Sequence, residues 1–508
     1  MPAKVLVIGL DAAEATLLER WAAEGDLPAF TRLTEKGAVA RLGNSLETLP
    51  GAIWPELTTG ISGGRTAQYY HPRQLHTGET ALRRIEPEEA AAFPHYWTHA
   101  SNAGRRVAVV DQPQTVMRDD LNGSMMTEWG LHDRNFGIAS DPPALLEEIR
   151  TRWGDHPIAS CDMHGYTREG YEQLLAGLVT GAGRKAEILL ELYGREDWDL
   201  FACCFGETHC VGHQFWHFFD PLQPGHDPNA PAELQEAIKT VYLEVGKGVE
   251  ALLDAAGPET AVLVVASHGM GTSVGGYQLL PEFLVRIGFG SGSGTTAQVR
   301  SHTPTSIKGV VRALTPGPVR RRVQARAGSL PLPLDSPDTK AIAVPNNRCG
   351  GIRFNLKGRE PHGMVEPGAE KDALVEELRR ELSELEEPES GERVVKRVVT
   401  AEEAFGPDHH SDIPDVMVVF RTDLGQINSA QSPRAGLLKL GQYGPNMPRT
   451  GDHTVESRLW AVGPGIAPGA RLPEANVLDL APTVLELLDV PRPDGLDGQP
   501  IAGVVARA

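Results

Sequence analysis

The chain has 508 residues, of which 41% are hydrophobic, and its 67 acidic and 48 basic residues give a formal net charge of -19. This length exceeds what one compact core usually holds, so we expect one large domain with a smaller domain inserted in it. The acidic balance argues against binding to nucleic-acid polymers or anionic membranes, and no run approaches the roughly 20 apolar residues that span a bilayer.

The cysteines and the first residues predict a cytoplasmic protein. The chain has 5 cysteines, an odd number, and two of them, Cys203 and Cys204, are adjacent, which does not fit a disulfide framework. The apolar run at residues 4–10 is too short for a signal sequence with its cleavage site, and Asp11 follows at once. We interpret this run as a first buried strand.

Short apolar runs alternate with helical patterns along the whole chain, which predicts an α/β fold with a parallel-rich sheet covered by helices on both faces. The expected strands are Val5–Leu10, Val107–Val110, Leu200–Cys204, Ala261–Ala266, Val416–Phe420 and Leu459–Val462. The expected helices are Glu14–Ala23, Pro143–Arg152, Glu172–Tyr193, Ala232–Ala255, Glu370–Leu385 and Leu478–Leu488. In such sheets, functional sites lie at the carboxyl ends of the strands.

A smaller lobe is expected in the second half of the chain. Residues 290–333 are rich in Gly, Ser, Thr, Pro and Arg, which predicts an excursion away from the core. The block Pro345–Leu356 alternates towards its end and predicts a hairpin. We therefore assign residues 1–285 and 400–508 to the catalytic domain and residues 286–399 to an inserted cap or substrate lobe.

Four segments offer metal-ligand side chains beside strand ends or glycine turns. His209 and His213 are four residues apart and share one face of a helix, which suits joint ligation of one ion; the alternative is a pair of capping or core-edge histidines. His268 follows a buried strand, where it could instead only bond the backbone of a tight turn. Asp11 follows the first strand, where it could simply cap the next helix. His453 stands in a Gly-Asp-His segment before another strand.

Thr48 is the candidate nucleophile. It precedes Trp54 and Thr59-Gly60 in a segment that leads into a predicted helix, whose N-terminus favours a developing alkoxide or a bound phosphate. A metal ion would activate the hydroxyl. The alternative is an ordinary Thr N-cap.

Taken in order, these segments resemble the alkaline phosphatase superfamily, in particular its type I phosphodiesterase/nucleotide pyrophosphatase branch. The shared features are Gly-Leu-Asp11, a hydroxyl ahead of Trp54 and Thr59-Gly60, Glu207-Thr208 to His213, His268-Gly269-Met270, His453 before Gly463-Pro464-Gly465, the segment Asn355–Pro361 and the tail Asp479–Thr483. The resemblance implies an alkaline-phosphatase-like fold. It also implies two metal ions that flank a Ser or Thr nucleophile, a covalent phospho-enzyme, and its hydrolysis by water.

Carried over by position, the resemblance gives Asp11, His268 and Thr48 to one ion and His209, His213 and His453 to the other. The expected cofactor is zinc, one or two ions, with manganese as an alternative.

The chain departs from the family pattern at three places. His209 and Ser267 stand where the family usually has Asp, so two anionic ligands are missing. Asp111, at the end of another strand, is a candidate replacement for one of them. An ungapped match also places Pro50 at the attacking position, so Thr48 requires a loop that is two residues longer. Ser45 is the reserve nucleophile.

The resemblance implies a hydrolase of a small phosphorylated substrate, a phosphodiester or a nucleotide pyrophosphate. Two alternatives remain open: a phosphonate hydrolase or phosphotransferase in a biosynthetic pathway, and a non-catalytic ligand-binding descendant. The lobe offers Arg300, Arg348, Arg353, Lys357 and Arg359 as candidate contacts to anionic oxygens. The sequence specifies neither the substrate nor the oligomeric state.

Overall fold

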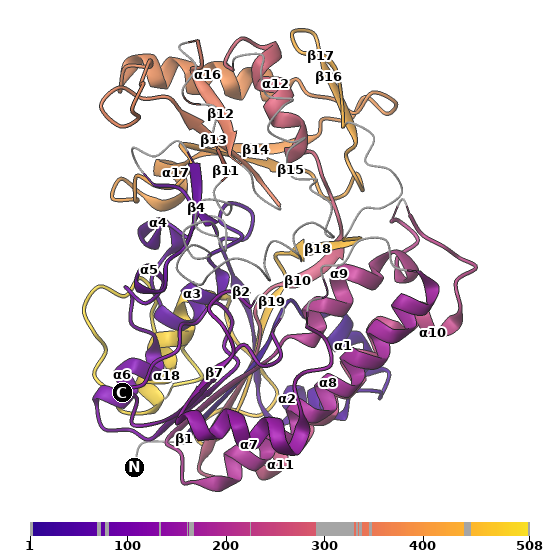
Figure 1. Ribbon diagram of the computed structural model, residues 1–508, viewed down its shortest axis with the longest axis vertical. Coiled ribbons are helices and arrows are strands. Elements are labelled where there is room, and N and C mark those ends of the chain that lie inside the picture. Colours follow the sequence, from indigo (N-terminus) through magenta and orange to yellow (C-terminus); the bar gives the residue numbers. More distant parts are fainter. Residues whose placement is uncertain are drawn as a thin grey trace, which may run out of the picture.

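The main sheet is built from the short apolar runs of the sequence (Figure 1). The computed structural model describes residues 4–68, 73–76, 81–131, 134–159, 161, 167–223, 225–290, 330–331, 334, 338–344, 348–440 and 449–505. In spatial order the strands are β20 (Ala470–Arg471), β2 (Ala38–Gly43), β19 (Ser457–Val462), β9 (Thr260–Ala266), β1 (Lys4–Leu10), β8 (Leu200–Phe205), β5 (Val107–Val110), β6 (Gly123–Thr127) and β7 (Ala139–Asp141), and β21 (Ala475–Asn476) also pairs with β2. The five strands from β9 to β6 run parallel, whereas β19 and β7 pair antiparallel with their neighbours.

Both faces of this sheet are buried, which confirms the predicted fold class. Along β1, Leu6 and Ile8 pack in one hydrophobic cluster, whereas Val5 and Val7 pack in another on the opposite face. The first cluster includes side chains of α1 (Ala15–Ala23), α2 (Pro28–Lys36), α7 (Pro143–Trp153), α8 (Arg168–Arg195), α9 (Glu207–Phe219), α10 (Ala232–Gln235) and α11 (Ala237–Ala255). The second includes α3 (Ile53–Thr59), α6 (Tyr96–Asn102) and α18 (Leu480–Leu487).

One predicted helix is interrupted. The expected helix Ala232–Ala255 divides into α10 and α11 at Glu236, whose ψ of 1° departs from the helical value. The remaining short elements are α4 (Gly63–Thr66), α5 (Pro87–Ala90), η3 (Val477–Asp479) and η1 (Tyr277–Leu279), of which η1 packs in the hydrophobic cluster of the smaller lobe.

A second, four-stranded antiparallel sheet forms the smaller lobe, in the order β12 (Ala341–Val344), β13 (Gly350–Phe354), β15 (Val416–Phe420) and β14 (Val395–Thr400). It packs with α12 (Leu280–Arg286) and α16 (Ala369–Ser383) around a separate hydrophobic cluster (Figure 1). Of the expected hairpin Pro345–Leu356, β13 is one strand, and its antiparallel partner β12 lies before that block. The Gly- and Pro-rich stretch 290–333, with Arg300, lies almost entirely outside the described residues.

Assigning residues 416–420 to the main sheet was wrong. β15 is buried between β13 and β14, and a fully apolar run looks the same in either sheet. The small sheet thus draws on residues beyond 399, and the division at 286 and 399 stays a prediction.

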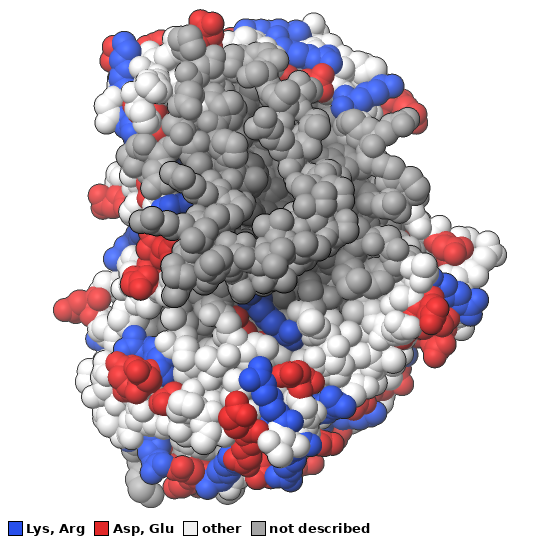
Figure 2. All heavy atoms as spheres, in the orientation of Figure 1, with Lys and Arg blue, Asp and Glu red and all other residues white. Residues whose placement is uncertain are grey.

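Short ribbons complete the architecture. β10 (Gly269–Thr272) pairs antiparallel with β18 (Gly451–Thr454) between the main sheet and the lobe. The others are β3 (Arg73–Gln74), β4 (Ala81–Arg84) and β11 (Leu330–Pro331), with β16 (Ser429–Ser432), β17 (Gly436–Lys439) and the helix α17 (Ala401–Phe405) in or near the lobe. Within the described residues, no helix combines the length and apolar character needed to cross a bilayer. Acidic and basic side chains are interspersed over the described part of the face in Figure 2.

Candidate metal centre

The topology brings the predicted ligand segments to one place. β1, β8 and β9 are parallel neighbours, so their carboxyl ends lie at the same edge of the sheet, where Asp11, the start of α9 and His268 follow them. His453 arrives on β18, which pairs with β10 in a register that sets His453 opposite Met270. Segments about 440 residues apart in the chain therefore meet at one site.

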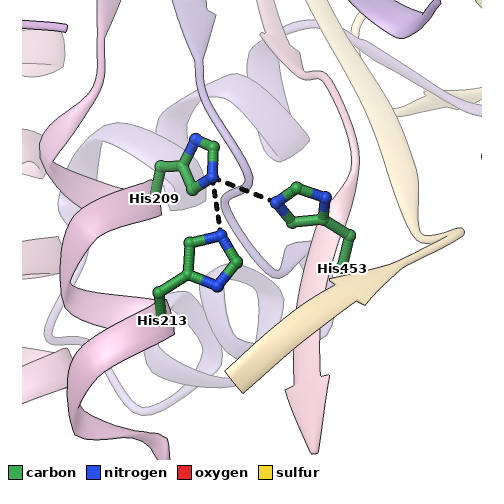
Figure 3. Close-up of side chains that lie close together, drawn as sticks. All are labelled: His209, His213 and His453. Carbon is green, nitrogen blue, oxygen red and sulfur yellow. Dashed lines mark hydrogen bonds between the residues drawn. The ribbon is translucent and has the colours of Figure 1, made fainter. Parts of the chain in front are cut away.

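Three imidazoles point at one another (Figure 3). The Nε2 atom of His209 lies 2.8 Å from Nε2 of His213 and 3.0 Å from Nε2 of His453. His209 and His213 come from successive turns of α9 and are buried, and the three side chains form the group among the described residues that is arranged to hold a metal ion.

The partners of the Nδ1 atoms of His209 and His213 indicate which ring nitrogens carry a proton. Nδ1 of His209 is 2.6 Å from Oδ2 of Asp11, and Nδ1 of His213 is 2.8 Å from the carbonyl oxygen of Gly451. Burial by itself would raise the pKa of Asp11, but the adjacent His209 and the hydrogen bond from Trp54 outweigh it, and the pKa lies well below its usual range. A carboxylate and a carbonyl only accept, so both Nδ1 atoms donate.

It follows that in neutral rings the Nε2 atoms of His209 and His213 carry lone pairs that face each other at 2.8 Å. A cation that binds both lone pairs removes this conflict. Burial, and then the neighbouring imidazoles, lower the pKa of His453 well below its ordinary value. The His453 ring therefore resists protonation, which favours a metal ion over a proton as its partner.

The three imidazoles fit a zinc ion. With Zn–N bonds of about 2.0–2.1 Å and tetrahedral angles, ligand nitrogens lie about 3.3 Å apart, a few tenths of an ångström more than the distances here. Three protein ligands leave one position for substrate, as in catalytic zinc sites. Nδ1 contacts to a carboxylate and a carbonyl are the usual supports of metal-binding histidines.

Asp11 belongs to this cluster through His209. Its Oδ2 lies against His209, and its Oδ1 accepts a hydrogen bond of 2.7 Å from Nε1 of Trp54. The side chain is only 4% exposed. Sequence reasoning missed the contact with Trp54, because Trp54 served there only as a landmark of the family pattern.

His268 lies beside the cluster. Its ring centroid is 4.3 Å from that of His453, and its Nδ1 is 3.0 Å from Oγ of Ser267. Its Nε2 is buried and has no hydrogen-bond partner. Burial lowers the pKa of His268 to about 4 against the opposing charge of Asp11, so the ring is neutral and its Nε2 is an open acceptor at neutral pH.

Thr48 is buried in a turn before α3, and its Oγ1 donates a hydrogen bond of 3.0 Å to the carbonyl oxygen of Ser45. Sγ of Cys349, from the lobe, lies 3.3 Å from the carbonyl oxygen of Thr48. Among the described contacts, none joins Thr48 to Asp11 or to the histidines. The hydroxyl of Ser45 donates to Glu56 at 2.7 Å.

Asp111 does not replace the missing carboxylate ligand. Its oxygens accept hydrogen bonds of 2.8 Å from the backbone of Trp129 and Gly130, and Oδ2 lies 3.2 Å from Nζ of Lys185. Lys185 is 1% exposed and also lies 3.5 Å from Glu207, the first residue of α9. This ion-pair network anchors the start of the helix that carries the two histidines.

Two of the basic residues proposed for substrate contact are engaged elsewhere. Arg353 is buried against Glu360 at 2.8 Å, and Arg359 makes two contacts of 2.7 Å with Asp415. Arg348, by contrast, lies near the metal site, because its positive charge acts on both His268 and Asp452 there.

Comparison with known proteins identifies the family of the chain. A family model described as type I phosphodiesterase / nucleotide pyrophosphatase matches residues 5–436. The solved structure of the alkaline phosphatase PafA is 14% identical and has a TM-score of 0.56, with coverage of 100% of this chain and 99% of that chain. Murine ectonucleotide pyrophosphatase / phosphodiesterase 5, in an inactive form in complex with AMP, is 11% identical over 96% of each chain, with a TM-score of 0.48.

A search of curated proteins gave no match. The likeness to PafA supports the fold. Because the family model covers most of the sequence, the chain belongs to the type I phosphodiesterase/nucleotide pyrophosphatase family and is a phosphoric ester hydrolase.

Proposed function

We propose that this chain hydrolyses a small phosphodiester or nucleotide pyrophosphate in a metal-dependent reaction, with Thr48 as the nucleophile. The observation that carries the metal dependence is the pair of imidazole lone pairs that face each other at 2.8 Å, with His453 completing the group. Zinc fits this donor set, and manganese is the alternative. The bound ion supplies Lewis-acid stabilisation of the negative charge that develops on the phosphoryl oxygens.

The chain's own residues carry the covalent steps. Oγ1 of Thr48 attacks phosphorus in line, the bond between phosphorus and the leaving oxygen breaks, and the threonine proton passes through water to the leaving oxygen, which departs as an alcohol or phosphate. Water then hydrolyses the phosphothreonine and restores the hydroxyl. Before the reaction, the hydroxyl of Thr48 donates a hydrogen bond to the carbonyl oxygen of Ser45. This hydrogen bond must break before Oγ1 can attack. Arg348 is the lobe side chain whose charge best suits contact with an anionic oxygen.

Metal dependence and reaction class are tested together. Purified wild type and His213→Ala are supplied with zinc or manganese and assayed on bis-(nitrophenyl) phosphate and nitrophenyl phosphate. We expect turnover of the diester to exceed that of the monoester and to be lost in the variant, which lacks one of three ligands. Wild type that holds metal and hydrolyses neither ester would contradict the proposal and favour phosphotransfer or ligand binding.

The nucleophile is tested with paired variants. We expect Thr48→Ala to lose at least about 10³-fold in kcat, as removal of a nucleophile does, and Thr48→Ser to keep measurable turnover and a phospho-enzyme detectable by mass spectrometry. Ser45→Ala is the matched control, because it removes a hydroxyl from the same turn but leaves the carbonyl that holds Thr48. The reverse pattern would assign the attack to Ser45, whose hydroxyl contacts the buried carboxyl of Glu56.

A further inference from the structure

We propose that this chain holds a single metal ion, bound by His209, His213 and His453, and that Asp11 orients His209 instead of binding a second ion. The inference rests on the metal dependence proposed above and concerns the number of ions. It departs from the two-ion arrangement that the family resemblance implies. Its basis is the set of contacts around Asp11, Ser267 and Thr48.

The carboxylate of Asp11 already has a partner on each oxygen. Oδ1 accepts from Trp54 at 2.7 Å and Oδ2 from Nδ1 of His209 at 2.6 Å, and the group is almost fully buried. A carboxylate in this position fixes the ring with its Nε2 directed at His213 and His453, which is how such partners support metal-binding histidines. The N–H of His209 thus provides the positive partner that a second ion would otherwise provide.

Ser267, which stands where the family usually has Asp, is also committed to local contacts. Its Oγ accepts from the backbone N–H of Ala12 at 3.3 Å and lies 3.4 Å from the carbonyl oxygen of Leu10 and 3.0 Å from Nδ1 of His268. The residue is fully buried. Ser267 therefore ties the ends of β1 and β9 together and positions the His268 ring.

The donors left for a second ion are too few. Thr48 donates its hydroxyl proton to a carbonyl, so His268 contributes the one unpartnered ligand atom, the buried Nε2. Catalytic zinc sites use three protein ligands. Two divalent ions about 3.5–4 Å apart would also need more negative charge than Asp11 alone provides.

The buried Asp452 does not make up this deficit. Its Oδ1 accepts from the backbone N–H of His453 at 2.8 Å. Among the described residues, no group of three His, Cys, Asp or Glu side chains other than the histidines has its ligand atoms close enough together to hold one ion.

The test counts ions without using activity. Protein is equilibrated with excess zinc, dialysed, and analysed by inductively coupled plasma mass spectrometry. We expect one zinc per chain in wild type and in His268→Ala, and none in His213→Ala. Asp11→Asn, which keeps an oxygen for hydrogen bonding, should also bind one zinc with an affinity about 10- to 100-fold lower. Circular dichroism establishes that each variant is folded.

A restoring variant makes the test sharper. His209→Asp combined with Ser267→Asp returns two carboxylates and is expected to bind two zinc ions per chain. Two ions in wild type, with a fall to one in His268→Ala and Asp11→Asn, would overturn the proposal, as would wild type that binds none. One zinc with no turnover of phosphate esters would refute the proposed function but leave this inference standing, and two ions with turnover would do the reverse.

Discussion

The carboxyl group of Glu56 lies under the turn that carries both candidate nucleophiles. It is 2% exposed and accepts hydrogen bonds from the backbone of Gly63 at 2.8 Å and from the hydroxyl of Ser45 at 2.7 Å. Burial raises its pKa to about 7 despite these two bonds. The folded protein therefore prefers this carboxyl group protonated, whereas the unfolded chain ionises it near pH 4.

This preference predicts a pH-dependent stability. Because the pKa of Glu56 is raised in the folded state, the contribution of this group to folding stability is fully present below the unfolded pKa. It is lost as pH rises through the folded value of about 7. We expect Glu56→Gln to be more stable than wild type at pH 8, by at most about 3 kcal/mol, with a smaller difference at pH 5. Urea unfolding at the two pH values measures this effect.

Glu47 provides the control of opposite sign. Burial alone would raise its pKa, but hydrogen bonds from Lys396 and Arg397 lower it, so Glu47→Gln should lose stability at pH 8. A Glu56→Gln protein less stable than wild type at pH 8 would show that the carboxylate is stabilised by its surroundings.

The elements of the lobe are joined by a buried ion pair. Oδ1 and Oδ2 of Asp415, just before β15, each lie 2.7 Å from Arg359, and Oδ2 also accepts from the backbone of Phe354 at the end of β13. Burial would raise the pKa of Asp415, but Arg359 outweighs it and the pKa is lowered. The ion pair of Asp415 and Arg359 thus contributes its full stability above the pKa of Asp415 in the unfolded chain. This contribution is lost as pH falls through the pKa of Asp415 in the folded protein.

We expect Asp415→Asn to lower the free energy of unfolding at pH 7 by about 1.5–3 kcal/mol, because it weakens the charge-assisted contacts of Arg359 with Asp415 and leaves Arg359 only the carboxylate of Glu360. The loss should shrink in acid, where wild type loses the same pair. Urea titrations at pH 7 and at a pH well below the unfolded value of about 3.9 measure both values. Glu366→Gln, which breaks the exposed pair with Lys357, is the control and should leave stability nearly unchanged.

At the scale of the whole molecule, the sequence predicted the parallel-rich sheet because its strands are short, apolar and separated by long helical patterns. It also predicted that His209, His213 and His453 belong together, through a resemblance that spans the chain. It did not predict the contact of Asp11 with His209 or that of Asp111 with the buried Lys185, since a carboxylate at a strand end looks alike whatever its partner. Those partners depend on three-dimensional contacts between distant segments.

Each lobe has a hydrophobic cluster of its own, and a smaller cluster joins them, in which Leu49 and Ala52 pack with Ile342 and Met417 of the lobe's sheet. Because the clusters internal to each lobe are larger than the shared one, we expect calorimetry to resolve two unfolding transitions. Chelation of the metal should lower only the transition of the large domain, because an ion at 100 times its Kd stabilises the folded state to which it binds by about 2.7 kcal/mol. Asp415→Asn should lower only the other. A single transition that responds to both changes would contradict this independence.

The ribbon of β10 and β18 links the chain on its way into the lobe with the chain on its way out. β10 follows His268 and leads to α12, whereas β18 returns to β19 and carries His453. With an ion bound, His453 is fastened to α9, so the returning strand cannot part from the main sheet until that bond breaks. The ion would thus act as a cross-link between α9 and the strand that returns from the lobe.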